Sequence, residues 1–462
     1  MIHPPPPPPC CSPFLLTRTV IRVTLLALPS LNVRDAHMSS LLLLLLLLLL
    51  LIAVPCAAAL TAPPHPSLKL RLSQVFTRHG DRTPLFVLPA PLEVDWHCDL
   101  RHLTTVNNDT HSVDEVSRLY RKNYMAEEEQ LPGNCATGEL TSVGAQQHQQ
   151  LGAKIRHRYV DEFGLLPPEV DPSVMFLRST DVPRTLASAM NFLEGLYPSL
   201  RELPKTGGLE SILDIFTMAF QNEFLLPTSV YCPIFAEKLK EAQKLPEWEN
   251  YFQKLQPLAK QLEKAWNLTT PIGTSFAGPY DTSWCRFSHQ KPLPPLVDLS
   301  VLKTLSDAAL FQITFPYSLN SVAQYGLGKL FQMILHNMET TQAGTNPHKF
   351  MLYSGHDTTI GPVLAALGIP LTEYPPYASH ILVELFQNTT DGSYHVGLQY
   401  NGEDVSSLEC PAPPQLCPWS SFVLSLIRNI PPNFGPACQP TSETPSDLLR
   451  HNDLDDFPPT SG

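Results

Sequence analysis

Hydrophobic and polar residues alternate along residues 67–77, and the later part of this segment is rich in β-branched and aromatic side chains. A period of two places every second side chain on the same face, so the pattern predicts a β-strand. Residues 174–177 are continuously apolar between Pro172 and Arg178, which predicts a strand buried on both faces. Three more strands are predicted near the end of the chain, at residues 350–353, 381–385 and 394–398.

The segments between these strands have a helical period. A helix is predicted from Leu140 to about Glu162, with one loose apolar stripe formed by Leu140, Val143, Leu151, Ile155 and Tyr159. Residues 181–197 are also helical in pattern. Residues 200–345 contain several amphipathic stretches broken by prolines and few strand-like runs.

Strands and helices thus alternate at both ends of the chain around a helical middle. This order predicts an α/β fold, a three-layer sandwich with a mostly parallel central sheet and an inserted, mostly helical cap domain. The expected bounds are residues 60–199 and 346–440 for the core and 200–345 for the cap. Residues 93–134 are polar without clear periodicity and are expected to form an insertion that leaves the core, called the excursion below. Residues 441–462 are expected to be a disordered acidic tail.

The N-terminal 59 residues have the features of a targeting segment. Six prolines at residues 4–9 form a leader, and eleven leucines at residues 41–51 precede small residues that end in Ala57, Ala58 and Ala59. An apolar core before small residues is typical of a cleaved secretory signal, whereas residues 41–60 are also long enough for an uncleaved signal anchor. We expect cleavage, with a membrane role only if the segment is retained; whether Met1 or Met38 initiates stays open. No later segment is long and apolar enough to span a bilayer.

The 462-residue chain is 16% charged and has a formal net charge of −12, which argues against nucleic-acid binding through a basic surface. The first 59 residues hold three Arg and one Asp, so the remainder is more acidic, with a net charge of −14. Seven of the ten cysteines lie in that remainder, and none has zinc-site spacing. In an oxidising compartment most should pair, and an odd number leaves at least one without a partner in the same chain. Candidate N-glycosylation sites are Asn108, Asn267 and Asn388.

Residues 78–84, Arg-His-Gly-Asp-Arg-Thr-Pro, directly follow the first predicted strand. Open α/β sheets place ligands at the carboxyl ends of strands. The glycine permits a close backbone approach, and two guanidinium groups offer forked donors to the oxygens of an anion. A histidine among arginines is disfavoured in its protonated form, which leaves a neutral, nucleophilic imidazole. The segment therefore predicts a phosphoryl-transfer site.

This segment resembles the histidine acid phosphatase family, branch 2 of the histidine phosphatase superfamily, whose motif is Arg-His-Gly, any residue, Arg, any residue, Pro. Residues 177–181, Leu-Arg-Ser-Thr-Asp, match a second motif with a phosphate-binding arginine. Residues 353–359, Tyr-Ser-Gly-His-Asp-Thr-Thr, match a third with the second histidine and the proton donor. Each motif follows a predicted strand, and the resemblance covers roughly residues 67 to 438.

The resemblance implies an acid phosphatase that works through a phosphohistidine. His79 is then the nucleophile and Asp357 the proton donor, while the phosphate is held by Arg78, Arg82, Arg178 and His356. No metal and no cofactor is implied, and an acid optimum is expected. The expected partner is a small phosphomonoester; no nucleic acid is expected and a homodimer stays open. By contrast, five other histidines are interpreted as surface residues: His97, His102, His111, His148 and His157.

The resemblance also implies a disulfide pattern, with Cys232 joined to Cys438 and Cys410 to Cys417. Cys285 matches a family cysteine whose usual partner position holds His380 here, so Cys285 is expected to be an unpaired thiol. Cys98 and Cys135 flank the excursion and are candidates for a third bridge.

Three alternatives stay open: a phytase, a sugar-phosphate phosphatase of the 2-phosphoxylose type, and a catalytically silent secreted protein of the same fold. A few sequence stretches look more like the Golgi 2-phosphoxylose branch. The expected location is the secretory pathway, either secreted or lysosomal, with Golgi anchoring as the alternative.

Overall fold

The computed structural model describes residues 67–89, 92–98, 131–201, 213–432 and 438, and the backbone of residues 103–105 and 119–121. All of them lie within one compact unit, Pro64–Gly462. The targeting segment, Asn108 and the acidic tail lie outside the described residues. None of the helices in the described ranges is long and apolar enough to cross a membrane.

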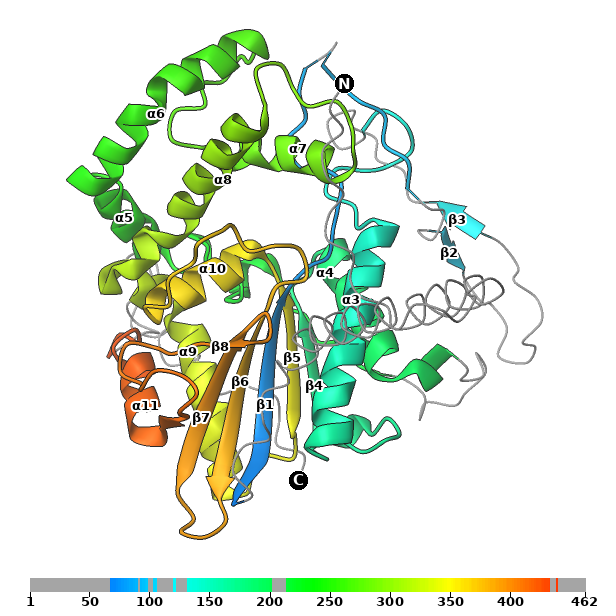
Figure 1. The fold of residues 1–462 in the computed structure, drawn as a ribbon, viewed down its shortest axis with the longest axis vertical. Helices are drawn as coiled ribbons and strands as arrows, with labels where there is room; N and C mark the ends of the chain where they lie inside the picture. Colours follow the sequence, from blue (N-terminus) through cyan, green and yellow to red (C-terminus); the bar gives the residue numbers. More distant parts are fainter. Residues whose placement is uncertain are drawn as a thin grey trace, which may run out of the picture. The chain divides into compact units, whose positions relative to one another are not determined.

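A seven-stranded sheet forms the centre of this unit (Figure 1). The order along the sheet is β4-β5-β1-β6-β7-β8, and β9 also pairs with β7. The strands are β1 (Leu68–Arg78), β4 (Met175–Ser179), β5 (Phe350–Gly355), β6 (His380–Asn388), β7 (Tyr394–Tyr400), β8 (Glu403–Asp404) and β9 (Cys417–Pro418). All five strands predicted from the sequence are present.

The sheet is mixed. The prediction of parallel pairing holds for β4, β5 and β1, the three strands that carry the sequence motifs. The pairs β1–β6, β6–β7, β7–β8 and β7–β9 are antiparallel. Residues 389–393 join β6 to β7 directly, and so short a connection makes a hairpin, since a parallel pair needs a longer crossover. The antiparallel direction of β7 relative to β6 is therefore a consequence of the short chain between them.

Helices cover both faces of the sheet. On one face α3 (Ser142–Arg156) and α4 (Pro183–Leu196) bury Leu151 and Phe192 against Val75 and Leu352. On the other face α9 (Asn320–Ala343), α10 (Asp357–Ala366) and α11 (Trp419–Ile427) form a second cluster with Phe76. Successive residues of β1, such as Val75 and Phe76, thus pack into opposite helical layers, as the period of two requires. The predicted three-layer sandwich is confirmed.

Four helices lie beyond the carboxyl ends of the parallel strands in Figure 1. They are α5 (Pro233–Ala242), α6 (Pro246–Ala265), α7 (Ala277–Ser288) and α8 (Leu299–Thr314). Three of them, α6, α7 and α8, share a cluster of their own that includes Phe252, Trp266 and Leu305. The sequence placed α9 in the same region, but Asn337 of α9 hydrogen-bonds Gln74 of β1 and Tyr353 of β5. We therefore group α9 with the layer that covers the sheet.

Several details differ from the sequence pattern. The helix predicted to continue to Glu162 ends as α3 at Arg156 and goes on as a π-helix, η3 (His157–Glu162). Val143, assigned to its apolar stripe, is 48% exposed. The polar excursion contains an antiparallel pair, β2 (Leu103–Thr105) and β3 (Leu119–Arg121). Four short 3₁₀ turns complete the list: η4 (Pro172–Val174), η5 (Pro198–Arg201), η7 (Phe220–Asn222) and η8 (Pro316–Ser318).

The cysteines in the described residues form three disulfides, Cys98–Cys135, Cys232–Cys438 and Cys410–Cys417. The predicted pairs are thus confirmed. Cys285 is buried and free, as the departure from the family pattern at His380 indicated.

Candidate active site

The three sequence motifs meet at one edge of the sheet. Strand β5 lies between β1 and β4, with Arg78 opposite Gly355 and Ser179 opposite Ser354. Parallel strands in register end at the same edge, so the residues that follow each strand become neighbours. His79 and His356, which are 277 positions apart in the sequence, have ring centroids 5.6 Å apart.

We call residues 78–84 the phosphate loop. Backbone contacts fix its first residues: Arg78 N donates to Ser379 O (2.8 Å), His79 N to Gly355 O (3.0 Å) and Gly80 N to Ser188 Oγ (3.1 Å). A Cβ atom at Gly80 would collide with the backbone of Gly144 in α3. The loop therefore lies directly on the first turn of α3, where only glycine fits.

The imidazole of His79 is held in one orientation. Its Nδ1 lies 2.9 Å from the carbonyl oxygen of Gly80, and the side chain is 1% exposed. A carbonyl can only accept, so Nδ1 carries the proton and Nε2 keeps its lone pair. Burial, followed by the charges of Arg184 and Arg78, lowers the pKa of His79 well below its ordinary value of 6.5. The ring is thus a neutral base with a free Nε2.

Asp357 begins α10, and its carboxylate pairs with the guanidinium of Arg78 at 2.9 Å. Thr358 N also donates to it at 2.8 Å. Burial alone would raise the pKa of Asp357, but the charges of Arg78 and Arg82 outweigh burial and lower it. In the empty site Asp357 is therefore a carboxylate.

His356 is the N-cap of α10, where its backbone N donates to Thr359 Oγ1. Its Nε2 lies 2.9 Å from Thr180 Oγ1, and its Nδ1 is 3.5 Å from Arg184 Nη2. Burial and then Arg184 lower the pKa of His356 to about 3. The second histidine is accordingly neutral as well.

The two arginines near the end of β4 have different environments. Arg178 pairs with Glu223 at 2.8 Å, and its guanidinium lies 4.1 Å from the ring centre of Phe224. Arg184, in the first turn of α4, lies beside His356 and has its pKa lowered to about 10 by burial and by Arg82. Arg178 therefore has a carboxylate partner away from the histidines, while Arg184 adds its charge to them.

Arg82 pairs with Asp281 of α7 at 2.7 Å. Arg78 lies under two tyrosines, 4.3 Å from the ring centre of Tyr377 and 5.5 Å from that of Tyr374. Buried guanidinium nitrogens without a hydrogen-bond partner among the described residues are the Nε atoms of Arg78, Arg82, Arg184, Arg286 and Arg428 and Nη1 of Arg178. Of these arginines, Arg78, Arg82 and Arg184 also lower the pKa of both His79 and His356 by their charge, so these three mark where an anion would be held.

Comparison with known proteins identifies the family. The family model of the histidine phosphatase superfamily (branch 2) matches residues 69–401. The chain belongs to this superfamily. The match spans β1 to β7 and includes all three motifs. As a member of this superfamily the protein is a phosphatase.

Three curated relatives have similar length. Counting factor 60 of Dictyostelium discoideum is 33% identical over 382 residues, which cover 82% of this chain and 90% of that protein. Human lysophosphatidic acid phosphatase type 6 is 26% identical over a match that covers 81% of this chain and 87% of that enzyme. Human 2-phosphoxylose phosphatase 1 is 27% identical over a match that covers 80% of this chain and 79% of that enzyme. The similar identities of the two human enzymes do not single out one branch.

Among solved structures, the phytase of Hafnia alvei in complex with tartrate superposes with a TM-score of 0.56 at 15% identity. It covers 81% of this chain and all of that one. At such low identity the similarity concerns the fold alone.

Five of the six residues predicted for this phosphatase site lie together: Arg78, His79, Arg82, His356 and Asp357. The sequence motifs missed Arg184, although it lies six positions after Arg178 at the start of a predicted helix. They also missed Thr180 and the tyrosines at 374 and 377. His148 was interpreted as a surface residue but is fully buried, with its Nε2 3.0 Å from Arg78 O, because α3 packs against β1 through it.

In the described ranges one group of side chains, Cys98, Cys135 and Glu139, has metal-ligand spacing. The two cysteines form a disulfide, and thiolates are needed to bind a metal. This group therefore does not fit a metal ion.

Proposed function

We propose that the protein is a phosphomonoester hydrolase that forms a phosphohistidine at His79. The observation that carries this proposal is the state of His79, a buried neutral imidazole whose Nδ1 is engaged by Gly80 O and whose Nε2 is free. A nucleophile needs an available lone pair, and the surrounding arginines offer donors to the phosphoryl oxygens.

In the first step Nε2 of His79 attacks phosphorus in line, and the bond to the ester oxygen breaks. The leaving alkoxide takes the proton of Asp357. In the second step Asp357, now a carboxylate, accepts a proton from the water that attacks phosphorus, and the bond to Nε2 breaks. Inorganic phosphate and the free histidine result, so both steps balance without another reactant.

We assign the binding of the phosphoryl oxygens to Arg78, Arg82, Arg184 and His356. The unpaired Nε atoms of the three arginines support this assignment. The sequence prediction gave the role to Arg178, and we assign it to Arg184 instead because the charge of Arg184 lowers the pKa of both His79 and His356. Spreading donors around the equatorial oxygens stabilises the charge of the transition state.

The proton donor requires acid conditions or a bound dianion. The pKa of Asp357 is lowered in the empty site, mainly because Arg78 and Arg82 outweigh burial. A phosphate dianion would offset these charges and raise that pKa. The low pKa of His79 keeps the nucleophile neutral in acid, which is consistent with an acid phosphatase.

Among the alternatives, a small monoester is favoured over a polyphosphorylated ring such as phytate. The side of the site formed by α7 supplies the carboxylate of Asp281, which pairs with Arg82. A carboxylate at this position repels additional phosphate groups. The disulfides support an oxidising compartment, so we place the enzyme in the secretory pathway. Exposed Asn267 and the hairpin residue Asn388 remain proposed glycan sites.

The test is to trap the intermediate. The full chain is mixed with ³²P-labelled aryl phosphate at pH 5 and quenched with alkali, and the label is located by peptide mapping. Label should appear on His79, be stable in alkali and be lost in acid. Hydrolysis without label on the protein, or label on another residue, would overturn the proposal. A parallel panel of aryl phosphate, phytate, lysophosphatidate and phosphorylated xylosides ranks the substrate classes.

A further inference from the structure

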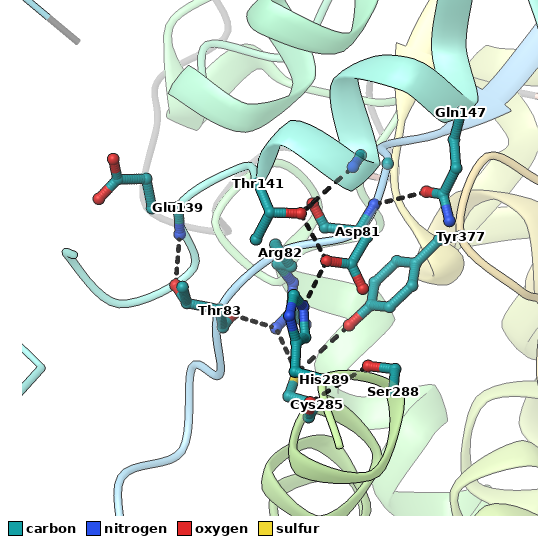
Figure 2. A network of polar contacts seen from close by, with 12 residues as sticks. Asp81, Arg82, Thr83, Glu139, Thr141, Gln147, Cys285, Ser288, His289 and Tyr377 are labelled. Carbon is teal, nitrogen blue, oxygen red and sulfur yellow. Dashed lines mark hydrogen bonds and ion pairs between the residues drawn. The ribbon is translucent and has the colours of Figure 1, made fainter. Parts of the chain in front are cut away.

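The phosphate loop makes one ion pair and one side-chain hydrogen bond with helix α7 and its C-cap. In one, Arg82 of the loop pairs with Asp281 of α7 (2.7 Å). In the other, Asp81 of the loop lies 2.7 Å from Nε2 of His289, the C-cap residue of α7. Two neighbouring residues of the loop are thus held by α7 and its C-cap, and Figure 2 shows the contact between Asp81 and His289.

The burial of Asp81 is unexpected from the sequence. The family motif allows any residue at this position, yet the Asp81 side chain is 3% exposed. Its Oδ1 accepts two short hydrogen bonds, from Thr141 Oγ1 (2.6 Å) and from His289 Nε2 (2.7 Å). A buried carboxylate without donors is strongly destabilised, so these two contacts decide where the side chain lies.

The backbone of Asp81 is held on the same side. Its N donates to Gln147 Oε1 at 2.8 Å, and its O accepts from Thr141 N at 3.0 Å. Thr141 is the N-cap of α3, the helix on which the loop lies. Asp81 therefore joins three elements, the loop, the start of α3 and the end of α7. His79 and Arg82 are its near neighbours in the chain.

His289 is itself held in place. Its ring meets the ring of Trp96 edge to face at 5.1 Å, and Lys291 Nζ lies 4.7 Å from the Trp96 ring centre. Asp281, two turns earlier in α7, accepts from Leu85 N (2.7 Å) and Phe86 N (3.2 Å) besides pairing with Arg82. The middle of the loop and the two residues that follow it are thus bound to one helix and its C-cap.

We propose that His289 is a positioning residue for the phosphoryl-transfer reaction. By donating to Asp81 it fixes the turn that sets His79 relative to Arg82, although it contacts neither substrate nor the reacting atoms. Binding of an in-line phosphoryl group requires these two side chains to keep their relative position within a fraction of an ångström. The inference rests on the proposed function above.

Two substitutions separate the donor from the ring. His289→Gln keeps an N–H close to the position of Nε2, and His289→Phe keeps the edge contact with Trp96 but removes the donor. His157→Phe is the matched control, because His157 is exposed on η3 and its partners are Asp161 and Glu162. For each variant, the fraction of active sites is counted from the ³²P burst. Then kcat and KM per active site and the inhibition constant of vanadate, a mimic of the five-coordinate phosphorus, are measured.

With His289→Phe we expect kcat per active site to fall and the vanadate constant to rise, each by about tenfold or more, with KM changed by less than about threefold. His289→Gln should restore both constants to within about threefold of the original protein. Asp81→Ala should add less loss on top of His289→Phe than it causes by itself, since both changes remove the contact between the two residues.

Three results would overturn the inference. One is unchanged kcat and vanadate binding in His289→Phe. Another is a smaller fraction of active sites in His289→Phe with unchanged kcat, KM and vanadate inhibition constant per site, which indicates a role in stability alone. The third is equal loss in the Gln and Phe variants. If His289→Phe does not fold, Asp81→Ala in the otherwise unchanged protein removes the same contact and gives the same readout. Absence of a burst in the original protein would instead refute the phosphohistidine proposal, so the two failures are distinguishable.

Discussion

Two groups of buried arginines in this protein differ in how their charge is balanced. On the α3 side of the sheet, Arg158 makes a bidentate pair with Glu384, with distances of 2.6 and 2.7 Å, and Tyr159 donates to the same carboxylate at 2.8 Å. Burial alone would lower the pKa of Arg158, but Glu384 outweighs it and raises the pKa. The guanidinium of Arg158 is thus neutralised by the carboxylate of Glu384 through two parallel hydrogen bonds.

At the carboxyl edge of the sheet, Asp357 and Asp281 likewise outweigh burial and raise the pKa of Arg78 and Arg82, but three arginines there meet only these two carboxylates. Arg78 and Arg82 each have a single carboxylate contact, to Asp357 and Asp281, and Arg184 lies beside the neutral His356. Their positive charge contributes to lowering the pKa of His79. The comparison shows that arginine burial has two uses. A fully paired arginine stabilises the fold, and an incompletely neutralised group binds an anion and keeps a nucleophile uncharged.

The largest effect is expected at the nucleophile. His79→Ala should reduce turnover by roughly five orders of magnitude, since no other group supplies a lone pair to phosphorus. Steady-state hydrolysis of aryl phosphate measures this, with circular dichroism to show that the fold is kept. Activity equal to that of the original protein would refute the site.

Asp357→Asn should separate substrates by leaving group. Alkyl phosphates need a proton on the departing oxygen, so their kcat should fall by about a thousandfold, while aryl phosphates should lose about tenfold. The measurement is kcat for β-glycerol phosphate and for p-nitrophenyl phosphate. Equal losses for the two would argue against proton donation by Asp357.

Arg184→Gln and Arg178→Gln test which arginine belongs to the anion-binding group. Loss of the Arg184 charge should lower kcat/KM by about a hundredfold and weaken inhibition by inorganic phosphate. Arg178→Gln should mainly lower the melting temperature, because it leaves Glu223 buried without its partner. The opposite pattern would restore Arg178 to the site.

The dependence on pH follows from the two lowered pKa values. Asp357 must be protonated to act as the acid, so kcat/KM should fall as pH rises, by up to about tenfold per pH unit. His79 stays neutral in acid because its pKa is well below 6.5, so it adds no loss between pH 6.5 and 5. The fall in kcat should begin at a higher pH than the fall in kcat/KM, since a bound phosphate dianion raises the pKa of Asp357. Asp357→Asn should abolish this decrease in activity with rising pH. If the variant still shows the decrease, another group is responsible for it.

The smallest effect on catalysis is expected at the paired arginine. Glu384→Ala should lower the free energy of unfolding by about 1–3 kcal/mol, because it removes the acceptor of the buried Tyr159 hydroxyl and the ion-pair partner of the partly buried Arg158. The folded fraction should keep its kcat and its pH profile. Urea titration gives the stability, and a shifted pH profile would show that the two arginine groups are coupled.

Much of this could be predicted from the sequence, because strands with a clear period and motifs at their ends are local signals. The five strands, the sandwich and five of the six proposed site residues belong to this class. Arg184 was missed because the choice between it and Arg178 depends on Glu223, which is 45 positions away from Arg178 along the chain. His148 was misassigned for a similar reason, since its burial comes from packing of α3 on β1. The antiparallel half of the sheet depends on pairing that local patterns do not specify.

The contact between Gly80 and Gly144 gives a criterion for recognising inactive relatives. A side chain at either glycine would collide with the backbone of the other segment. A homologue that retains Arg-His-Gly but carries a larger residue at the position of Gly144 would have its nucleophile displaced, even though every motif residue is present. Motif search alone would misread such a sequence as an active enzyme. The residue at the position of Gly144, in the first turn of α3, would distinguish a pseudoenzyme from a phosphatase.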